Sequence, residues 1–397
     1  WKGIETNPQN QLFLMALGLG VPWQITRSEL TSNPTFGQTA PSRGKILEIE
    51  LNFERGTKFA CPQCGGICPV HDTESRVWRH LDFWQHQTYL RARTPRVKCP
   101  EHGVVQIGLP WARSGSGFTL LFEMMVMTLI ADMAVSALAE HLHEHDTRLW
   151  RIVRHYVEKA HAATDWSGMT TVAIDETATR KGHNYATVVV DMDSPVVTQA
   201  ERARLIFMTP ERKASCVNLF AQEMVNHGSK PEDILCAAID MGRPYIQGVS
   251  SYLPNAEICF DRFHVMKLCG KAIDDLRKDL QRQGIDLKGS RWALRGNVEN
   301  LNEKQLALRE RLLSEHSELA RAFAMRDELR ALWNYTNQDV LRTGRSLKEL
   351  AATHLKAWCR WAQRSRLVSM VKLGRSIREH AEGILGYYLN GTTSAAI

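Results

Sequence analysis

The chain has 397 residues, which is too long for one ordinary hydrophobic core and predicts several domains. A hydrophobic content of 44% and a charged content of 23% exclude a mainly disordered protein, while a net charge of +7 is too small to identify a partner. No apolar run reaches the roughly 18 residues of a membrane-spanning helix, because the nearest candidate, 118–139, contains Glu123 and Asp132. These counts predict a soluble protein with no membrane partner.

Four of the nine cysteines are clustered with the spacing of a zinc ribbon. Cys61-Pro-Gln-Cys64 and Cys99-Pro-Glu-His102 each place two ligands three positions apart, so two tight turns can share one tetrahedral ion. Cys68 and His71 have the same spacing and are the alternative second pair, and loop cysteines without a metal would also fit. The expected ligands of a structural Zn²⁺ are Cys61, Cys64, Cys99 and His102.

A helix-turn-helix unit is predicted next. Apolar residues at helical spacing indicate helices near 118–131 and from Met133 onward, and Asp146 or Thr147 can cap a further helix. Basic residues lie on the polar face of that last helix, as in a helix that reads the major groove of DNA. The turn lacks the usual glycine, and any short helical hairpin gives this pattern. The expected DNA contacts are Arg148, Arg151 and Arg154.

The middle of the chain alternates strands and helices. Apolar or β-branched runs near 169–175, 185–191 and 204–208 predict three antiparallel strands. A helix, a strand near 233–240, a second helix and a strand near 256–261 follow. This order is that of a ribonuclease-H-like fold.

Two aspartates end strands of this predicted sheet. Asp175 and Asp240 each follow a buried apolar run, and close carboxylates repel each other unless a cation lies between them. Mg²⁺ or Mn²⁺ would resolve the repulsion, and a pair of such ions can clamp both oxygens of a phosphoryl transfer. The alternative is that both residues only cap loops after strands. Glu176 points to the other side of its strand and is the weaker ligand candidate.

The last third of the chain is predicted to be helical and basic. Leucines recur among charged residues from 263 to 386, and ten basic residues against one acidic residue, Glu349, lie between Val340 and Arg378. Together with the acidic segment 163–262, this distribution is typical of a carboxylate site next to a basic surface that binds a polyanion. Solvent-exposed helix faces without a binding role also produce it. The expected phosphate contacts are Arg364, Arg366 and Lys372.

The sequence therefore predicts an α/β multidomain protein. A zinc ribbon and a helix-turn-helix unit precede a ribonuclease-H-like catalytic domain with a long all-helical insertion. The predicted segments are a strand-containing segment (1–58), the zinc ribbon (59–110), the helix-turn-helix domain (111–165), the first part of the catalytic core (166–262), the helical insertion (263–386) and the start of a returning catalytic segment (387–397).

A series of motifs runs along nearly the whole chain. They are Cys61-Pro-Gln-Cys64 with Cys99-Pro-Glu-His102, Leu149-Trp-Arg-Ile-Val, Ala173-Ile-Asp175-Glu176, Ile239-Asp240-Met-Gly-Arg-Pro-Tyr245, Asp261-Arg-Phe-His264 and His380-Ala-Glu-Gly-Ile-Leu385. In this order they resemble the DDE transposases of the ISL-three type of bacterial insertion sequences. The order of the family's segments is also the order predicted above.

The resemblance implies an enzyme that cuts and joins the inverted repeats at the ends of its own element. Two divalent ions would activate water and then the freed 3′-hydroxyl, with Asp175 bridging both ions and Asp240 holding one. A third acid, usually Glu, completes such a site. The implied partners are the terminal repeats and target DNA, bound by a homo-oligomer that holds two ends together in the bacterial cytoplasm, at the nucleoid.

The sequence departs from the family pattern where the third acid is expected. The family places it in an Asn-Gly … Glu-Gly-x-Asn stretch, and the sequence from Asn390 to Ile397 matches only the start of that stretch. Because the chain also begins with Trp1 rather than Met, we expect truncation at both ends or a decayed copy that cannot cut DNA. Glu379 and Glu382 are possible substitutes that no pattern marks.

A rival function from another class is a DNA-binding regulator whose C-terminal part only dimerises. The N-terminal half of such a regulator would have the same sequence features, but a regulator needs no pair of carboxylates. Carboxylates of Asp175 and Asp240 within about 4–5 Å favour a shared cation, and a separation beyond about 10 Å favours the regulator. A truncated transposase could also regulate by occupying the terminal repeats.

Overall fold

The computed structural model describes residues 8–32, 45–180, 184–193, 204–296 and 298–390. It divides into two compact units, Trp1–Ala160 and His161–Ile397, which are described separately. The predicted returning segment lies outside the described residues from 391 onward. In the described part of the chain, no helix combines the length and the apolar composition needed to cross a bilayer.

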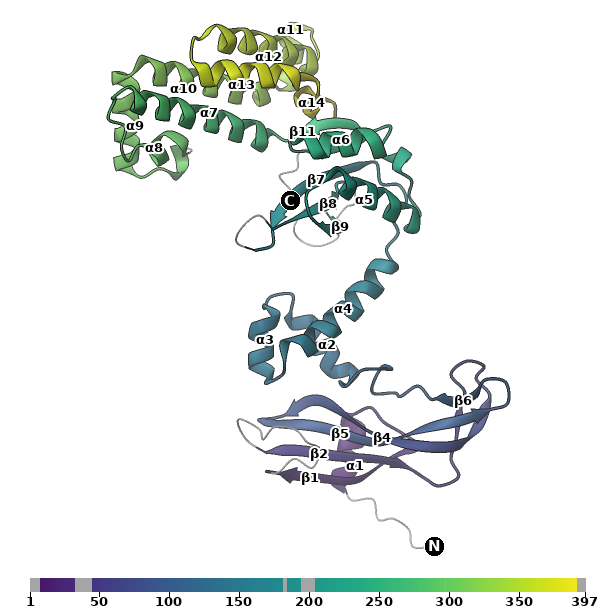
Figure 1. The fold of residues 1–397 in the computed structure, drawn as a ribbon. Coiled ribbons are helices and arrows are strands. Elements are labelled where there is room, and N and C mark those ends of the chain that lie inside the picture. The colour runs from purple at the N-terminus through teal and green to yellow at the C-terminus, as the bar shows by residue number, and fades with distance from the viewer. Residues whose placement is uncertain (1–7, 33–44, 181–183, 194–203, 297, 391–397) are drawn as a thin grey trace. The chain divides into compact units, whose positions relative to one another are not determined.

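A twisted sheet forms the larger part of the first unit (Figure 1). Within the described residues its strand order is β1-β2-β5-β4-β3, with β6 added to β5. The pairing of β2 with β5 is parallel, and the other neighbours are antiparallel. The helix that precedes the sheet is α1 (Pro8–Ala16), and the strands are β1 (Trp23–Thr31), β2 (Ile46–Phe53), β3 (Lys58–Ala60), β4 (Ile67–Phe83), β5 (His86–Cys99) and β6 (Gly103–Gln106).

One hydrophobic core serves all of this sheet. Trp23 of β1 and Leu51 of β2 pack in the same cluster as Cys61, Cys99 and Trp111. The predicted strand-containing segment and the predicted ribbon are therefore joined in one sheet, because β2 pairs with β5 over six residues from Ile46 to Leu51.

Three helices complete the first unit: α2 (Leu120–Leu129), α3 (Val135–Leu142) and α4 (Asp146–Ala162), of which the last two residues, from His161 on, belong to the second unit. Their apolar faces meet in one cluster that includes Phe122, Leu138 and Leu149. The turn between α3 and α4 has no glycine, and His143 adopts the left-handed conformation there instead, with φ 53°. Backbone bonds between Arg79 and the Gly117–Thr119 segment connect the sheet to these helices.

The second unit begins with a five-stranded sheet in the order β11-β10-β7-β8-β9. The three strands β7, β8 and β9 are antiparallel neighbours, whereas β10 is parallel to both β7 and β11. This topology confirms the ribonuclease-H-like prediction. The elements are β7 (Thr171–Ala178), β8 (Tyr185–Asp191), β9 (Arg204–Pro210), α5 (Ala214–Asn226), the 3₁₀ turn Pro231–Asp233, β10 (Cys236–Ile239), α6 (Arg243–Tyr252) and β11 (Glu257–Phe260).

The predicted helical insertion is a group of packed helices, drawn in green to yellow in Figure 1. Its long first helix, α7, buries Val265, Cys269, Ile273 and Leu280 at helical spacing. The elements are α7 (Arg262–Arg282), α8 (Arg291–Arg295), α9 (Glu303–Glu315), α10 (Ser317–Ala331), α11 (Asn337–Thr343), α12 (Leu347–Arg364), α13 (Val368–Glu379), α14 (Ala381–Leu385) and α15 (Tyr387–Asn390), with 3₁₀ turns at Val298–Asn300 and Leu332–Asn334.

Two local features explain how these helices start and return. Glu349, the one acid in the basic run, forms a capping box with Ser346 at the start of α12. At the end of the region, α14 returns to the edge strand β11 so closely that a Cβ on Gly383 would lie 2.5 Å from the Phe260 ring. Glycine at 383 therefore permits the helical region to close against the sheet.

Gly248 is expected to be essential for the close packing of α6 on α5. An added Cβ at Gly248 would lie 2.6 Å from Cγ2 of Val217, whereas Gly270 of α7 has no such neighbour within 4 Å. We expect Gly248→Ala to lower the free energy of unfolding by about 1–2 kcal/mol and Gly270→Ala to raise it by up to about 1 kcal/mol. Urea denaturation of the two matched variants measures both, and equal effects would contradict the packing argument.

Candidate functional site

Three aspartates lie at equivalent positions of three adjacent parallel strands. Ile174 of β7 pairs with Ile239 of β10, and Ile239 pairs with Phe260 of β11. The next residue in each case is an aspartate, so Asp175, Asp240 and Asp261 occupy equivalent positions. Asp240 and Asp261 directly follow β10 and β11, whereas β7 continues to Ala178, so the prediction that Asp175 ends its strand is wrong. Neighbouring strands lie about 4.8 Å apart. The register therefore brings the two predicted aspartates and a third, unpredicted one to the same edge of the sheet.

The same face of the sheet carries all three aspartates. Residues 172, 174, 237 and 239 point into the main core, while Ala173, Ala238 and Cys259 form a separate small-residue cluster on the opposite face. Side chains alternate between the two faces along a strand. Each aspartate lies two residues after a member of this cluster and is therefore on the same face as the cluster. The small side chains next to the carboxylates are themselves buried, with Met192 and Tyr387 packed against them.

His264 connects two of these carboxylates. Its Nδ1 lies 3.4 Å from Oδ2 of Asp261, and its Nε2 lies 3.9 Å from Oδ1 of Asp175. The Asp261 side chain is buried and raises the pKa of His264, and Asp175 and Asp240 act in the same direction against the effect of burial. Sequence reasoning assigned no role to Asp261 or His264. The detectable signal was the Asp-x-x-His spacing at a helix start, which places His264 one turn after Asp261.

Asp240 is held against the start of α6. The backbone N–H of Gly242 donates to Oδ1 of Asp240 at 2.7 Å. A Cβ on Gly242 would lie 2.5 Å from that oxygen and 3.2 Å from the carboxylate carbon. Only glycine at 242 therefore leaves this carboxylate where it is. Asp175 has a comparable local bond, because its Oδ1 accepts from the N–H of Glu176 at 2.7 Å.

Glu176 is paired differently from Asp175. Its Oε2 lies 2.5 Å from Nε of Arg212. Burial raises the pKa of Glu176, Arg212 opposes this rise, and the charges of Asp240 and Asp175 add to it. The ion pair with Arg212 agrees with Glu176 being the weaker ligand candidate.

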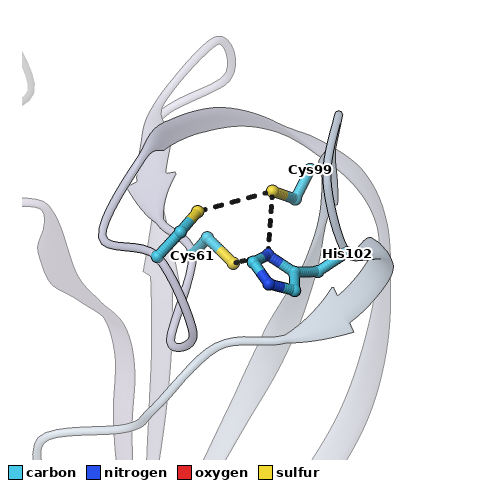
Figure 2. Close-up of side chains that lie close together, drawn as sticks. Cys61, Cys99 and His102 are labelled. Atoms are coloured by element: carbon cyan, nitrogen blue, oxygen red, sulfur yellow. Dashed lines mark hydrogen bonds between the residues drawn. The ribbon is translucent and has the colours of Figure 1, made fainter.

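Cys61, Cys64, Cys99 and His102 form a compact group in the first unit. Figure 2 shows three of them, Cys61, Cys99 and His102, close together. Nδ1 of His102 lies 3.8 Å from Sγ of Cys61 and 3.5 Å from Sγ of Cys99, and the Cys64 and Cys99 sulfurs are 3.6 Å apart. Ligands bound to one tetrahedral Zn²⁺ at about 2.0–2.3 Å are separated by similar distances. The donor set and its spacing fit zinc.

The backbone lowers the pKa of two thiols in this group. N–H groups of Cys64 and Gln63 lower the pKa of Cys61, and the N–H of His102 lowers the pKa of Cys99. For Cys64 the N–H of Gly66 acts in the same direction, but the neighbouring Cys99 thiol, burial and Cys61 raise its pKa to about 11. The alternative pair is arranged differently. Cys68 donates to the carbonyl of Gly66 at 3.4 Å, and neither Cys68 nor His71 belongs to the metal-type group found among the described residues.

The predicted DNA-binding residues are in two environments. Arg148 pairs with Glu144, and its guanidinium lies 4.4 Å from the centroid of the Phe118 ring. It therefore contributes to the packing between α4 and the residues before α2. The remaining predicted contacts are exposed: Arg151 and Arg154 on α4, Arg364 at the end of α12, Arg366 in the following turn and Lys372 on α13.

Comparison with known families gives three matches in the order of the structural elements. Residues 57–102 match a zinc finger of the IS204/IS1001/IS1096/IS1165 transposases, and residues 109–157 match the helix-turn-helix domain of transposase family ISL3. Residues 172–397 match the transposase region of the same family. The chain therefore belongs to the ISL3-type transposases, as the sequence resemblance predicted.

Two curated transposases are similar over most of their length. The transposase for insertion sequence element IS1557 of Mycobacterium tuberculosis, found in two strains, is 27% identical over 82% of this chain and 75% of its own. The transposase for insertion sequence element IS1001 of Bordetella parapertussis is 28% identical over 86% of this chain and 82% of its own.

His80 is expected to make the first unit sensitive to acid. Its Nδ1 lies 2.8 Å from Oγ1 of Thr119, the N-cap of α2, and burial together with the charge of Arg79 lowers its pKa to about 4. Below about pH 6.5 the unfolded chain binds a proton at His80 that the folded chain does not. Stability should therefore fall by about 2–3 kcal/mol as the pH drops from about 6.5 to 4.

The matched variant is His80→Asn, which keeps a polar partner for Thr119 but cannot titrate. The difference in unfolding free energy between wild type and variant should change with pH over this window. An NMR titration that gave His80 an ordinary pKa in the folded chain would contradict this expectation.

Proposed function

We propose that the transposase represented by this sequence binds the terminal inverted repeats of its insertion sequence and catalyses metal-dependent DNA cleavage and strand transfer. The observation that carries the proposal is the register of Asp175, Asp240 and Asp261 on three parallel strands. A binding protein without catalysis has no need for three carboxylates at one sheet edge, where they repel one another.

Asp175 and Asp240 are proposed as the ligands of the catalytic divalent cation, Mg²⁺ or Mn²⁺. An ion bound there would supply Lewis-acid activation at a phosphodiester. The chain's own residues fix the carboxylates: Gly242 donates its N–H to Asp240, and the N–H of Glu176 does the same for Asp175. His264 is proposed as a positioning residue that keeps Asp175 oriented through its contact with Asp261.

Cys61, Cys64, Cys99 and His102 are proposed as the ligands of a structural Zn²⁺. The site lies beside the core of the first sheet, because Cys61 and Cys99 pack with Trp23 and Trp111. Zinc there would stabilise the β3–β6 end of the sheet and take no part in the chemistry.

The exposed arginines of α4 are proposed to contact DNA, with the basic surface at the α12–α13 turn as a second phosphate contact. The helical fold α2–α4 and the family match support α4 as the reading helix. Transposition requires two element ends to be held together, so we propose a homo-oligomer assembled on DNA, at the nucleoid of the cell.

Divalent-cation binding is the first test, because it needs the two aspartates and no further group. After loading the chain with Zn²⁺, we expect Mn²⁺ binding by electron paramagnetic resonance to weaken at least about tenfold in Asp175→Asn and Asp240→Asn. Gly242→Ala should also weaken it, since its Cβ displaces the Asp240 carboxylate. Gly270→Ala is the control.

Cleavage of a terminal-repeat duplex with Mg²⁺ is the second readout. Any cleavage by the wild-type chain should be lost in both aspartate variants. Unchanged Mn²⁺ binding in Asp175→Asn and Asp240→Asn would refute the proposed cation site and favour the DNA-binding regulator.

DNA binding should depend on α4. We expect the double variant Arg151→Ala, Arg154→Ala to bind terminal-repeat DNA more weakly and to reduce the slope of log K against log salt by about 1 for each phosphate that the protein no longer neutralises. Lys304→Ala, at an exposed position on α9, should change neither. Fluorescence anisotropy at several salt concentrations measures both quantities, and an unchanged slope in the double variant would exclude α4 as the phosphate-binding element.

A further inference from the structure

A second group of metal-type side chains lies in the second unit. His161 in the last turn of α4, Glu223 in α5 and His227 at the end of α5 each offer one ligand atom, and these atoms lie within 4.8 Å of one another. Among the described residues, this trio and the zinc-ribbon quartet are the groups of this kind. None of the three belongs to the aspartate site.

Each imidazole has one nitrogen already bonded to a backbone carbonyl. Nε2 of His161 lies 3.1 Å from the carbonyl oxygen of Ile206 in β9, and Nδ1 of His227 lies 2.8 Å from that of Thr164. A carbonyl oxygen only accepts, so each of these nitrogens carries a proton. The neutral ring then has a lone pair on its other nitrogen. Metal-binding histidines in proteins are commonly oriented by such a bond from the second nitrogen.

The carboxylate is oriented in the same manner. Oε2 of Glu223 accepts from the side-chain amide of Asn226 at 3.1 Å, and Oε1 lies 3.3 Å from Nε2 of His227. That separation equals the roughly 3.3 Å expected between two ligands on one tetrahedral ion with bonds of about 2.0–2.1 Å. Without a cation or a proton between them, the lone pairs of Nε2 and Oε1 would face each other.

The surroundings hold the group in place while leaving one side accessible. The His227 ring is buried and stacks on Trp166, with ring centroids 4.2 Å apart. The His161 ring meets the His227 ring edge-on at 4.7 Å. The Glu223 side chain is 32% exposed, so a cation can enter from the solvent side. Packing thus fixes both imidazoles, and Asn226 orients the partly exposed carboxylate beside them.

We propose that His161, Glu223 and His227 bind a Zn²⁺ ion, with water as the fourth ligand. Two imidazoles and one carboxylate suit zinc and exclude Mg²⁺ or Ca²⁺ as the preferred ion, because those cations select oxygen ligands. The ion fastens the last turn of α4 to the end of α5, and through the Ile206 carbonyl to β9. Its role is structural, and it does not depend on the proposed catalytic function.

Zinc content of the full chain tests the proposal. The protein is loaded with Zn²⁺ and dialysed against buffer containing millimolar Mg²⁺, which occupies carboxylate sites without competing for imidazoles. We expect two zinc ions per wild-type chain and one in His161→Gln and in Glu223→Gln. The matched control, Glu310→Gln at an exposed position on α9, should keep two. Circular dichroism of the zinc-loaded proteins checks that each variant is folded.

Cobalt substitution assigns each ion to its ligands. A Cys61→Ser, Cys99→Ser variant should retain one Co²⁺ with visible ligand-field bands and no thiolate charge-transfer band. Glu223→Gln should retain the thiolate spectrum alone, and its affinity for the other ion should fall at least about tenfold.

Two results would overturn the proposal. One is a single zinc ion in the wild type that is lost in the Cys61→Ser, Cys99→Ser variant, as expected if a proton shared by His227 and Glu223 takes the place of the cation. The other is two zinc ions in wild type, His161→Gln and Glu223→Gln alike.

Discussion

The parallel register of β10 with β7 and β11 is the constraint on which the second unit depends. It joins strands from separate parts of the chain and sets Asp175, Asp240 and Asp261 side by side. A shift of one residue would turn each aspartate to the opposite face. The core residues Val172, Ile239 and their neighbours prevent such a shift, because it would bury carboxylates and expose the apolar side chains. Hydrophobic burial thus fixes the positions of charges that repel one another.

The first unit depends on a comparable junction around Arg79. This side chain is buried, pairs with Asp82 and Glu144, and lies over the rings of Tyr89 and Phe122. Its backbone bonds to the segment before α2, so one residue of β4 holds the helices of the DNA-binding fold against the ribbon sheet. The cost of burying a guanidinium is offset by two carboxylates and two aromatic faces.

The sequence predicted the fold class well, because apolar runs, cysteine spacing and helical periodicity are local signals. It did not predict that β2 pairs with β5, since a parallel pair 41 residues apart leaves no local pattern. For the same reason it missed the contact of His264 with Asp175 and the grouping of His161 with Glu223 and His227. Residue type alone also predicted the same role for Arg148 as for Arg151 and Arg154. In the structure, Arg148 differs from the other two because it packs against Phe118.

His264 lies in the first turn of α7 and so links the helical region to Asp175 and Asp261. α7 has 21 residues and begins one residue after Asp261, so it is a rod of about 30 Å fixed at one end to the sheet. A tilt of about 5° would move its far end by roughly 3 Å while turning the His264 ring through the same small angle. A tilt of α7 relative to the sheet would therefore reach Asp175 only as a small rotation of the His264 ring.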